Sequence, residues 1–60
     1  MSAVGFRSGQ KFRFPKPYDH IECWFEDIRY ENGIPIIGYR DAYDEYAEMR
    51  GYDLVELTHA

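Results

Sequence analysis

Four side chains that can bind metal ions lie close together in the sequence: His20, Glu22, Cys23 and Glu26. On an extended strand, His20 and Glu22 would share one face and Cys23 would point to the other, because successive side chains alternate. A tetrahedral zinc site needs converging thiolate or imidazole donors, and one cysteine with two distant histidines supplies few of them. We therefore expect no metal site, and we interpret Cys23 as a core thiol beside a solvated His20.

The sequence contains no recognisable catalytic motif. It has neither a glycine-rich phosphate loop nor a nucleophile elbow, and the hydroxyl side chains Ser2, Ser8 and Thr58 lie near its ends. Adjacent carboxylates occur at 26–27 and 44–45, but acid–base catalysis needs a carboxyl group held in a cleft with a shifted pKa. A chain of 60 residues can barely enclose one core, which leaves little room for such a cleft. We expect no enzymatic activity and no cofactor.

The cations of the first seventeen residues alternate with aromatic rings. Arg7, Lys11, Arg13 and Lys16 are interleaved there with phenylalanines, a pattern that suits phosphate contacts combined with base stacking. The rest of the chain, however, carries all eleven acids against three arginines, a net charge of −8. That charge repels phosphate within a Debye length of about 8–10 Å. We keep Lys11, Arg13 and Lys16 as an alternative nucleic-acid-binding set and do not expect nucleic acid as the main partner.

Aromatic residues outnumber the places that a small core offers. The chain has six Tyr, four Phe and one Trp, and each ring buries about 150–250 Å² when it is enclosed. Five rings suit the core by their place in the expected strands: Phe12, Phe14, Phe25, Tyr30 and Tyr39. Five more are harder to bury in so small a body: Tyr18, Trp24, Tyr43, Tyr46 and Tyr52.

Trp24 is expected to face outward between two carboxylates, Glu22 and Glu26. Exposed aromatic rings rimmed by acids are typical of hot spots for a partner that offers Arg, Lys or Pro side chains. Together with Tyr18 and Tyr43, these residues form the predicted partner-binding surface. The alternative is that the tyrosines lie flat over the core with only their hydroxyl groups in water.

The elements that must position these residues are predicted to be strands. Lys11–Phe14 alternates polar and aromatic residues, and the prolines at 15 and 17 then predict an irregular loop over 15–19. Residues 21–30 also alternate, but with a phase shift of one residue that predicts a β-bulge near Glu26–Asp27. Asn32-Gly33 is a strong type I′ hairpin signal. A two-residue turn there would pair Ile28 with Ile37.

Residues 41–50 contain no β-branched residue and fit two structures. Asp41 could cap a helix that ends before Gly51. Alternatively, Ala47 and Met49 alternate with charged neighbours, which suits a short strand after a turn at 42–44. The chain would then close with a strand in which Val55 and Leu57 face the same way.

Residues 9–57 resemble the small SH3-like barrels, including the KOW and Tudor-like variants. Gly9–Phe14 is similar to their "G-x-K-V-R-F" opening strand, and Glu48–Leu54 is similar to their "E-V-R-G-x-D-L" strand and 3₁₀ turn. Two positions depart from the pattern: Cys23 and Asp44 stand where glycine is expected at the bend and in the third hairpin. The tail 47–57 also resembles the helix-glycine-strand end of the N-terminal domain of translation initiation factor three. These are scaffold motifs, so they imply a fold and no activity.

We therefore predict a mostly β protein, a five-stranded SH3-like barrel with a short 3₁₀ turn before the last strand. Residues 9–60 would form a single domain after a flexible arm at 1–8. The alternative is an α+β fold, an antiparallel sheet with one helix at about 41–50 followed by a C-terminal strand.

The expected function is that of a non-catalytic protein–protein interaction module. We interpret the chain as a small acidic adaptor or inhibitor, of a kind typical of phage or mobile elements, whose protein partner has a basic or Pro/Arg-containing surface. A single cysteine, no signal-peptide pattern and no 18-residue apolar run predict a cytoplasmic protein that does not enter a membrane. It would be a monomer or a homodimer. The alternatives are a nucleic-acid-binding module and a structural subunit of a homo-oligomer.

Overall fold

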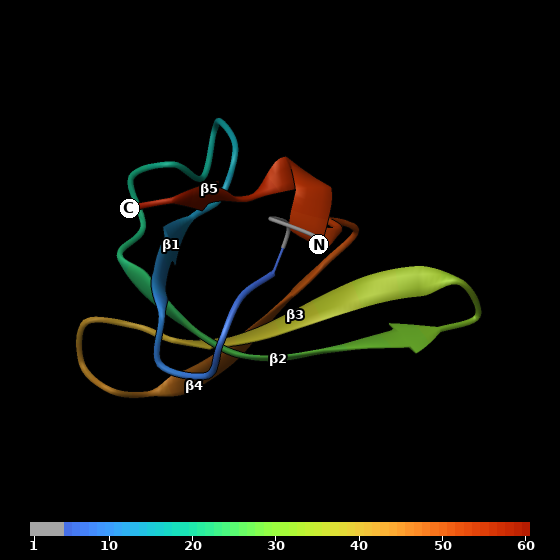
Figure 1. Ribbon diagram of the computed structural model, residues 1–60, viewed down its shortest axis with the longest axis horizontal. Helices are drawn as coiled ribbons and strands as arrows, with labels where there is room; N and C mark the ends of the chain where they lie inside the picture. Colours follow the sequence, from blue (N-terminus) through green and yellow to red (C-terminus); the bar gives the residue numbers. More distant parts are fainter. Residues whose placement is uncertain (1–4) are drawn as a thin grey trace.

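The computed structural model describes residues 5–60 as one antiparallel sheet with a single 3₁₀ turn (Figure 1). The elements follow in the order β1 (Lys11–Arg13), β2 (Cys23–Glu31), β3 (Ile34–Arg40), β4 (Tyr46–Arg50), η1 (Leu54–Glu56) and β5 (Thr58–His59). The sheet order is β4-β3-β2-β1-β5. The mostly β class, the five strands and the 3₁₀ turn before the last strand are confirmed.

A bulge in β2 curves the sheet. Phe25 pairs with Tyr39 and Asp27 pairs with Gly38, so Glu26 has no cross-strand partner. This is the position that the phase shift predicted, and the extra residue bends the strand. The start of β2 pairs with β1, and most of its length pairs with β3. In the part of the chain that the structure describes, β4 and β5 do not pair with each other, so the sheet is curved but open.

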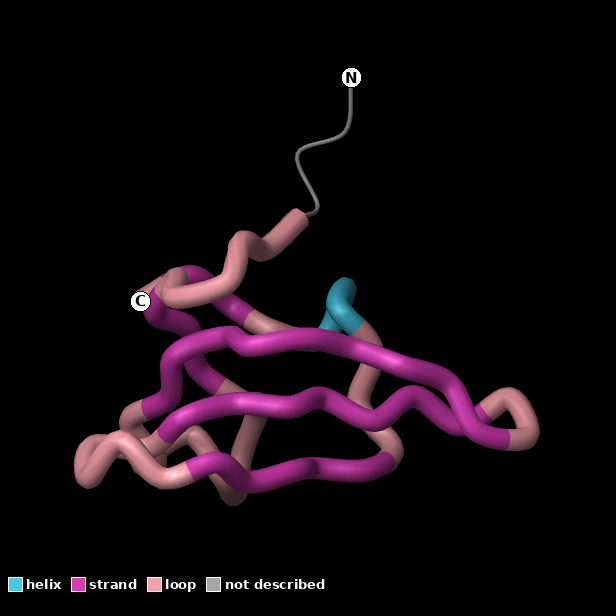
Figure 2. Tube along the Cα trace, turned by 90° about the horizontal axis from the view of Figure 1, so that it is seen from below, coloured by secondary structure: helices cyan, strands magenta, loops and turns pink. Residues whose placement is uncertain are grey.

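The β2–β3 hairpin turns at Asn32-Gly33 and projects beyond the rest of the sheet (Figure 1, Figure 2). Asn32 and Gly33 have φ angles of 52° and 80°, as a type I′ turn requires. The predicted register is confirmed, because Ile28 pairs with Ile37. Ile37 and Tyr39 consequently lie on the core face, where both are buried.

Residues 41–50 form a turn followed by β4, so the alternative helix at 41–50 was wrong. The Asp41 side chain explains how the chain reverses there. Its Oδ1 accepts hydrogen bonds from the backbone N–H groups of Tyr43 at 2.8 Å and Glu45 at 3.0 Å. Asp44 supplies the positive φ, 62°, that was expected of glycine, because short Asp side chains tolerate this region. Ala47 then faces the core, as the strand interpretation required.

The core lies inside the curve of the sheet and consists mainly of aromatic rings. Its buried members are Phe12, Phe14, Cys23, Phe25, Ile37, Tyr39 and Leu57. Tyr30, which we expected there, is 56% exposed, since the projecting hairpin carries it past the body and its hydroxyl donates to Asp53 at 2.8 Å. Val55 does not face inward with Leu57 either. It lies in the 3₁₀ turn and is 75% exposed.

The first described residues add to the core. The Phe6 ring lies 5.8 Å from Phe12 and 5.7 Å from Phe25, and it stacks on His59 at 4.5 Å between ring centroids. The packed body therefore begins at Phe6, ahead of the expected domain start at Gly9. Residues 1–4 of the expected arm lie outside the described residues. Within 5–60, no helix is long and apolar enough to cross a membrane.

Candidate partner-binding surface

An open pocket of about 450 Å³ lies between the start of β2 and the β3–β4 turn. The Ser8–Gly9 turn forms one side of it. Its other main lining residues are Trp24, Phe25, Glu26, Arg40, Asp41 and Asp44. Two local structures bring them together: the bulge in β2, and the turn that the Asp41 carboxylate holds. Trp24 and Glu26, two of the five predicted contact residues, thus share one concave surface.

The pocket carries more negative than positive charge. Three carboxylates line it, from Glu26, Asp41 and Asp44, against the single guanidinium of Arg40. Arg40 Nε lies 3.5 Å from Glu26 Oε1, and its Nη1 donates to the backbone oxygen of Asp44 at 3.1 Å. The guanidinium also lies 5.9 Å from the ring centroid of Tyr46. Arg40 is therefore held in place by its neighbours, and the lining keeps a formal charge of −2.

Trp24 is half-buried, with cations on both neighbouring strands. Its cross-strand partners are Lys11 on β1 and Arg40 on β3. Lys11 Nζ lies 5.4 Å from the centroid of the indole and 3.4 Å from Glu22 Oε2. Glu22 is thus connected to Trp24 indirectly, because Lys11 forms an ion pair with Glu22 and also lies over the indole ring. The indole side chain forms a wall of the pocket that is neither enclosed in the core nor fully free in water.

The remaining two predicted contact residues lie in different places. Tyr43 is 85% exposed in the turn from which Asp41, Ala42 and Asp44 line the pocket. Tyr18 lies in the β1–β2 loop, where its ring packs 6.3 Å from Tyr52, which in turn lies 5.9 Å from Phe14. Figure 1 shows that loop at the top of the view and the 41–45 turn at its lower left. Two of the five predicted residues therefore line the pocket, Tyr43 lies in the adjoining turn, Glu22 contacts Lys11 beside Trp24, and Tyr18 belongs to a second aromatic cluster.

In the alternative nucleic-acid-binding set, Arg13 and Lys16 lie at the surface, but the phenylalanine rings on either side of Arg13 are buried. Phe12 and Phe14 are each only 1% exposed, so neither can stack on a base. Lys11 is paired with Glu22, whereas Arg13 and Lys16 are exposed. Arg13 and Lys16 therefore lie at the surface without Phe12 or Phe14 as a stacking platform beside them.

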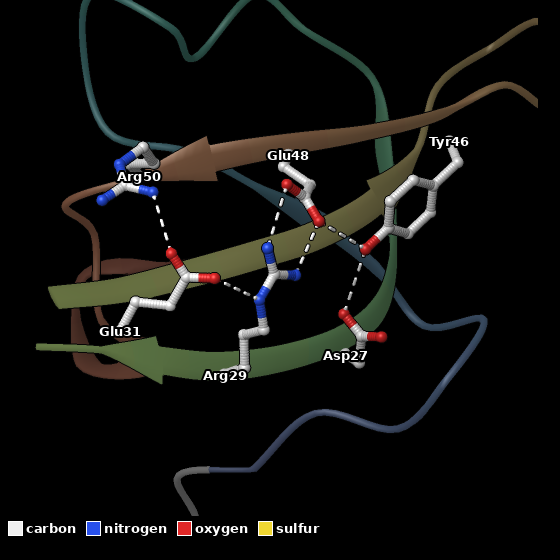
Figure 3. A network of polar contacts seen from close by, with 6 residues as sticks. All are labelled: Asp27, Arg29, Glu31, Tyr46, Glu48 and Arg50. Carbon is white, nitrogen blue, oxygen red and sulfur yellow. Dashed lines mark hydrogen bonds and ion pairs between the residues drawn. The ribbon is translucent and has the colours of Figure 1, made fainter.

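A network of charged side chains covers the outer face of β2, β3 and β4 (Figure 3). Arg29 is its centre: Nη1 lies 2.6 Å from Glu48 Oε2, and Nε lies 3.2 Å from Glu31 Oε2. Arg50 Nη1 lies 3.5 Å from the other oxygen of Glu31. Ile36 has Arg29 and Arg50 as its cross-strand neighbours and is fully buried beneath this layer. We did not predict the network, because it depends on the register of β4.

Tyr46 connects this network to the pocket. Its hydroxyl donates to Glu48 at 3.1 Å and lies 3.5 Å from Asp27 Oδ1, directly above Gly38. A Cβ on Gly38 would collide with the ends of both side chains, so a larger residue there would displace the Tyr46 hydroxyl and the Asp27 carboxylate. The pKa of Glu48 is lowered, first by its hydrogen bonds from Arg29 and then by that from Tyr46. Glu48 therefore stays ionised at neutral pH.

Cys23 and His20, two residues of the cluster with metal-binding chemistry, are each engaged by backbone groups. Cys23 is fully buried and its Sγ donates to the backbone oxygen of Ile21 at 3.3 Å. Burial raises the pKa of the Cys23 thiol to about 11, so the reactive thiolate is scarce. His20 Nδ1 lies 3.0 Å from the backbone oxygen of Pro17. Across residues 5–60, no group of three or more His, Cys, Asp or Glu side chains could hold a metal ion.

Comparison with protein-family models, with curated proteins and with solved structures gives no match for this chain. The fold and the surface therefore define it only as a small, open, antiparallel β protein with an acidic pocket walled by one tryptophan.

Proposed function

We propose that this chain is a non-catalytic protein-interaction module, with strands arranged as in the SH3-like folds, that binds a partner through the pocket around Trp24. The observation that carries the proposal is the combination of an indole wall with three carboxylates in one open pocket. Aromatic anchors at the centre of a charged rim are typical of binding hot spots. Tyr43, 85% exposed beside the pocket, extends this surface.

The proposed partner presents a basic side chain, from Arg or Lys, to the pocket. The formal charge of −2 on the lining attracts a cation, and the indole can add a cation–π contact. A guanidinium would in addition make charge-assisted hydrogen bonds to a carboxylate. An Arg- or Lys-containing segment of a partner protein meets these requirements better than an acidic one. An adaptor or an inhibitor is the role that suits a domain with one such surface.

The test is a binding measurement against arrays of basic, neutral and acidic peptides, followed by variants of this chain. Trp24→Ala should weaken binding to the selected basic peptides at least tenfold, with an unchanged circular dichroism spectrum. Tyr18→Ala is the matched control, because it removes an aromatic ring on the other cluster and should leave binding intact. An equal loss for both variants would refute the pocket as the binding site.

Binding to oligonucleotides gives a second refuting outcome. If a DNA or RNA strand binds at low salt, with a steep decline as salt is added, and Arg13→Ala weakens it, then the basic set is the functional surface instead. Preference for acidic over basic peptides would also contradict the proposed partner chemistry.

A further inference from the structure

The free edge of β4 is a five-residue stretch of unpaired backbone at one end of the sheet. β4 has five residues and ends the sheet on one side, whereas β5 on the other side has two. Backbone bonds flank β4: Asp41 N–H donates to Glu45 O at 3.0 Å, and Gly51 N–H donates to Pro35 O at 2.9 Å. In an antiparallel ladder, hydrogen-bonded and non-hydrogen-bonded residue pairs alternate. Since Glu45 bonds to the residue after β3 and Gly51 bonds to β3, every second residue between them bonds to β3 as well. The N–H and C=O groups of Tyr46, Glu48 and Arg50 therefore point away from β3.

The side chains on this edge form a self-complementary pattern. Glu48 and Arg50 lie two residues apart on the same face and carry opposite charges. We propose that a second copy of this chain pairs antiparallel with β4, with a two-fold axis at Met49. In that register Glu48 of each copy faces Arg50 of the other, and these two pairs form four backbone hydrogen bonds.

Two neighbouring symmetric registers, centred on other β4 residues, are less favourable. An axis at Glu48 would place two ionised carboxylates opposite each other, which destabilises a strand pair. Protonation would not relieve this at neutral pH, because Arg29 lowers the pKa of Glu48. An axis at Ala47 would bring Arg50 opposite Asp44, where φ is 62° and the strand has ended.

The proposed pairing continues the charged network of the outer face. Figure 3 shows that the network runs from β2 across β3 and ends on β4, with Glu48 bound to Arg29 and Arg50 bound to Glu31. In the dimer, Arg50 of one copy would lie between its own Glu31 and Glu48 of the second copy. The charges would then alternate in sign without a break across the interface. The 41–45 turn lies beyond the overlap, so this proposal does not depend on the pocket or on what binds there.

Cysteine cross-linking of the full chain tests the register. Met49→Cys should form an interchain disulfide under mild oxidation, because residues at the axis would lie directly opposite each other. Ala47→Cys, two residues away on the same face, should not. Wild type is the control, since its only cysteine, Cys23, is buried. A disulfide from Ala47→Cys alone, or only from a mixture of the two variants, would overturn the proposed register.

Sedimentation and charge reversal test the association itself. The weight-average mass of wild type should rise towards that of a dimer between low micromolar and millimolar concentrations. Glu48→Arg and Arg50→Glu should each remain monomeric, because each brings like charges together. An equimolar mixture of the two should form a heterodimer, because both of its charge pairs are then opposite. A wild type that stays monomeric at millimolar concentration, or a mixture that does not associate while both variants are folded, would overturn the proposal.

Discussion

Replacing Asp41 with alanine should destabilise the protein by removing the group that holds the β3–β4 turn. The carboxylate accepts two backbone hydrogen bonds, from Tyr43 at 2.8 Å and from Glu45 at 3.0 Å. The turn has no glycine, and Asp44 must adopt a φ of 62°. Without the carboxylate, two N–H groups would have to find water, and the reversal would depend on the backbone bonds of Asp41 with Glu45 and Asp44 and on the Arg40 contact.

The expected loss follows from these two bonds. A hydrogen bond contributes about 0.5–1.5 kcal/mol to stability, and about 1.5–3 kcal/mol when one partner is charged. Asp41 is half-buried and water can replace part of each bond, so we take about 1 kcal/mol for each and about 2 kcal/mol in total. In a domain of this size, 1 kcal/mol shifts Tm by about 4–8 °C. Asp41→Ala should therefore lower Tm by about 10 °C.

Thermal unfolding followed by circular dichroism measures this shift. Asp41→Asn is the matched control, because it keeps an acceptor oxygen in the same place and loses only the charge. We expect Asp41→Asn to retain about half of the lost stability. A Tm for Asp41→Ala within about 2 °C of wild type would refute the reasoning. Equal losses for the alanine and asparagine variants would show that charge, and not the position of the acceptor, holds the turn.

Gly33→Ala should cost about 1 kcal/mol in urea unfolding, because φ is 80° and a Cβ is strained there; an unchanged midpoint would contradict the type I′ turn. Since Arg29 and Tyr46 lower the pKa of folded Glu48, its stabilising effect is complete above the unfolded pKa of about 4.3 and is lost as the pH falls through the lower folded pKa. Glu48→Gln should therefore flatten the acid side of the stability curve, and an unchanged slope would oppose this. Cys23, with a thiol pKa raised to about 11, should react with Ellman's reagent at pH 8 only when the chain unfolds; rapid labelling of the folded protein would contradict its burial.

Local sequence patterns specified much of the fold before any contact was known. Asn32-Gly33 set both the turn and the register, so that the pairing of Ile28 with Ile37 followed from counting residues. The phase shift in the apolar alternation located the bulge, because only an inserted residue restores the facing of Ile28. These features depend on residues that are close together in the chain. Their geometry follows from backbone φ and ψ preferences and from the alternation of side chains.

Residues 41–50 show where local patterns were insufficient. Their composition suited both a helix and a strand, and the choice was made by contacts distant in sequence. Ala47 and Met49 bury their side chains against the core only if the segment pairs with β3. The turn before β4 contains no glycine by which it could have been predicted. The Asp41 side chain stabilises it by accepting hydrogen bonds from two backbone N–H groups.

The candidate partner-binding surface was also predicted from the sequence only in part. The outward direction of Trp24 was readable from alternation, and Trp24 and Glu26 of the five predicted residues line one pocket. Sequence could not place Tyr18, because the loop that carries it is irregular and its ring packs on Tyr52, far along the chain.

The sequence by itself determined the first three strands, the tight hairpin and the charge of this protein, because these follow from side-chain alternation, backbone preference and composition. Only the tertiary structure decided which charges meet. Arg29, Glu48 and Arg50 lie on strands whose register is set by burying Ile37 and Met49 on the opposite face. Packing of the core thus fixed the polar network and the edge of β4, which no local pattern could reveal.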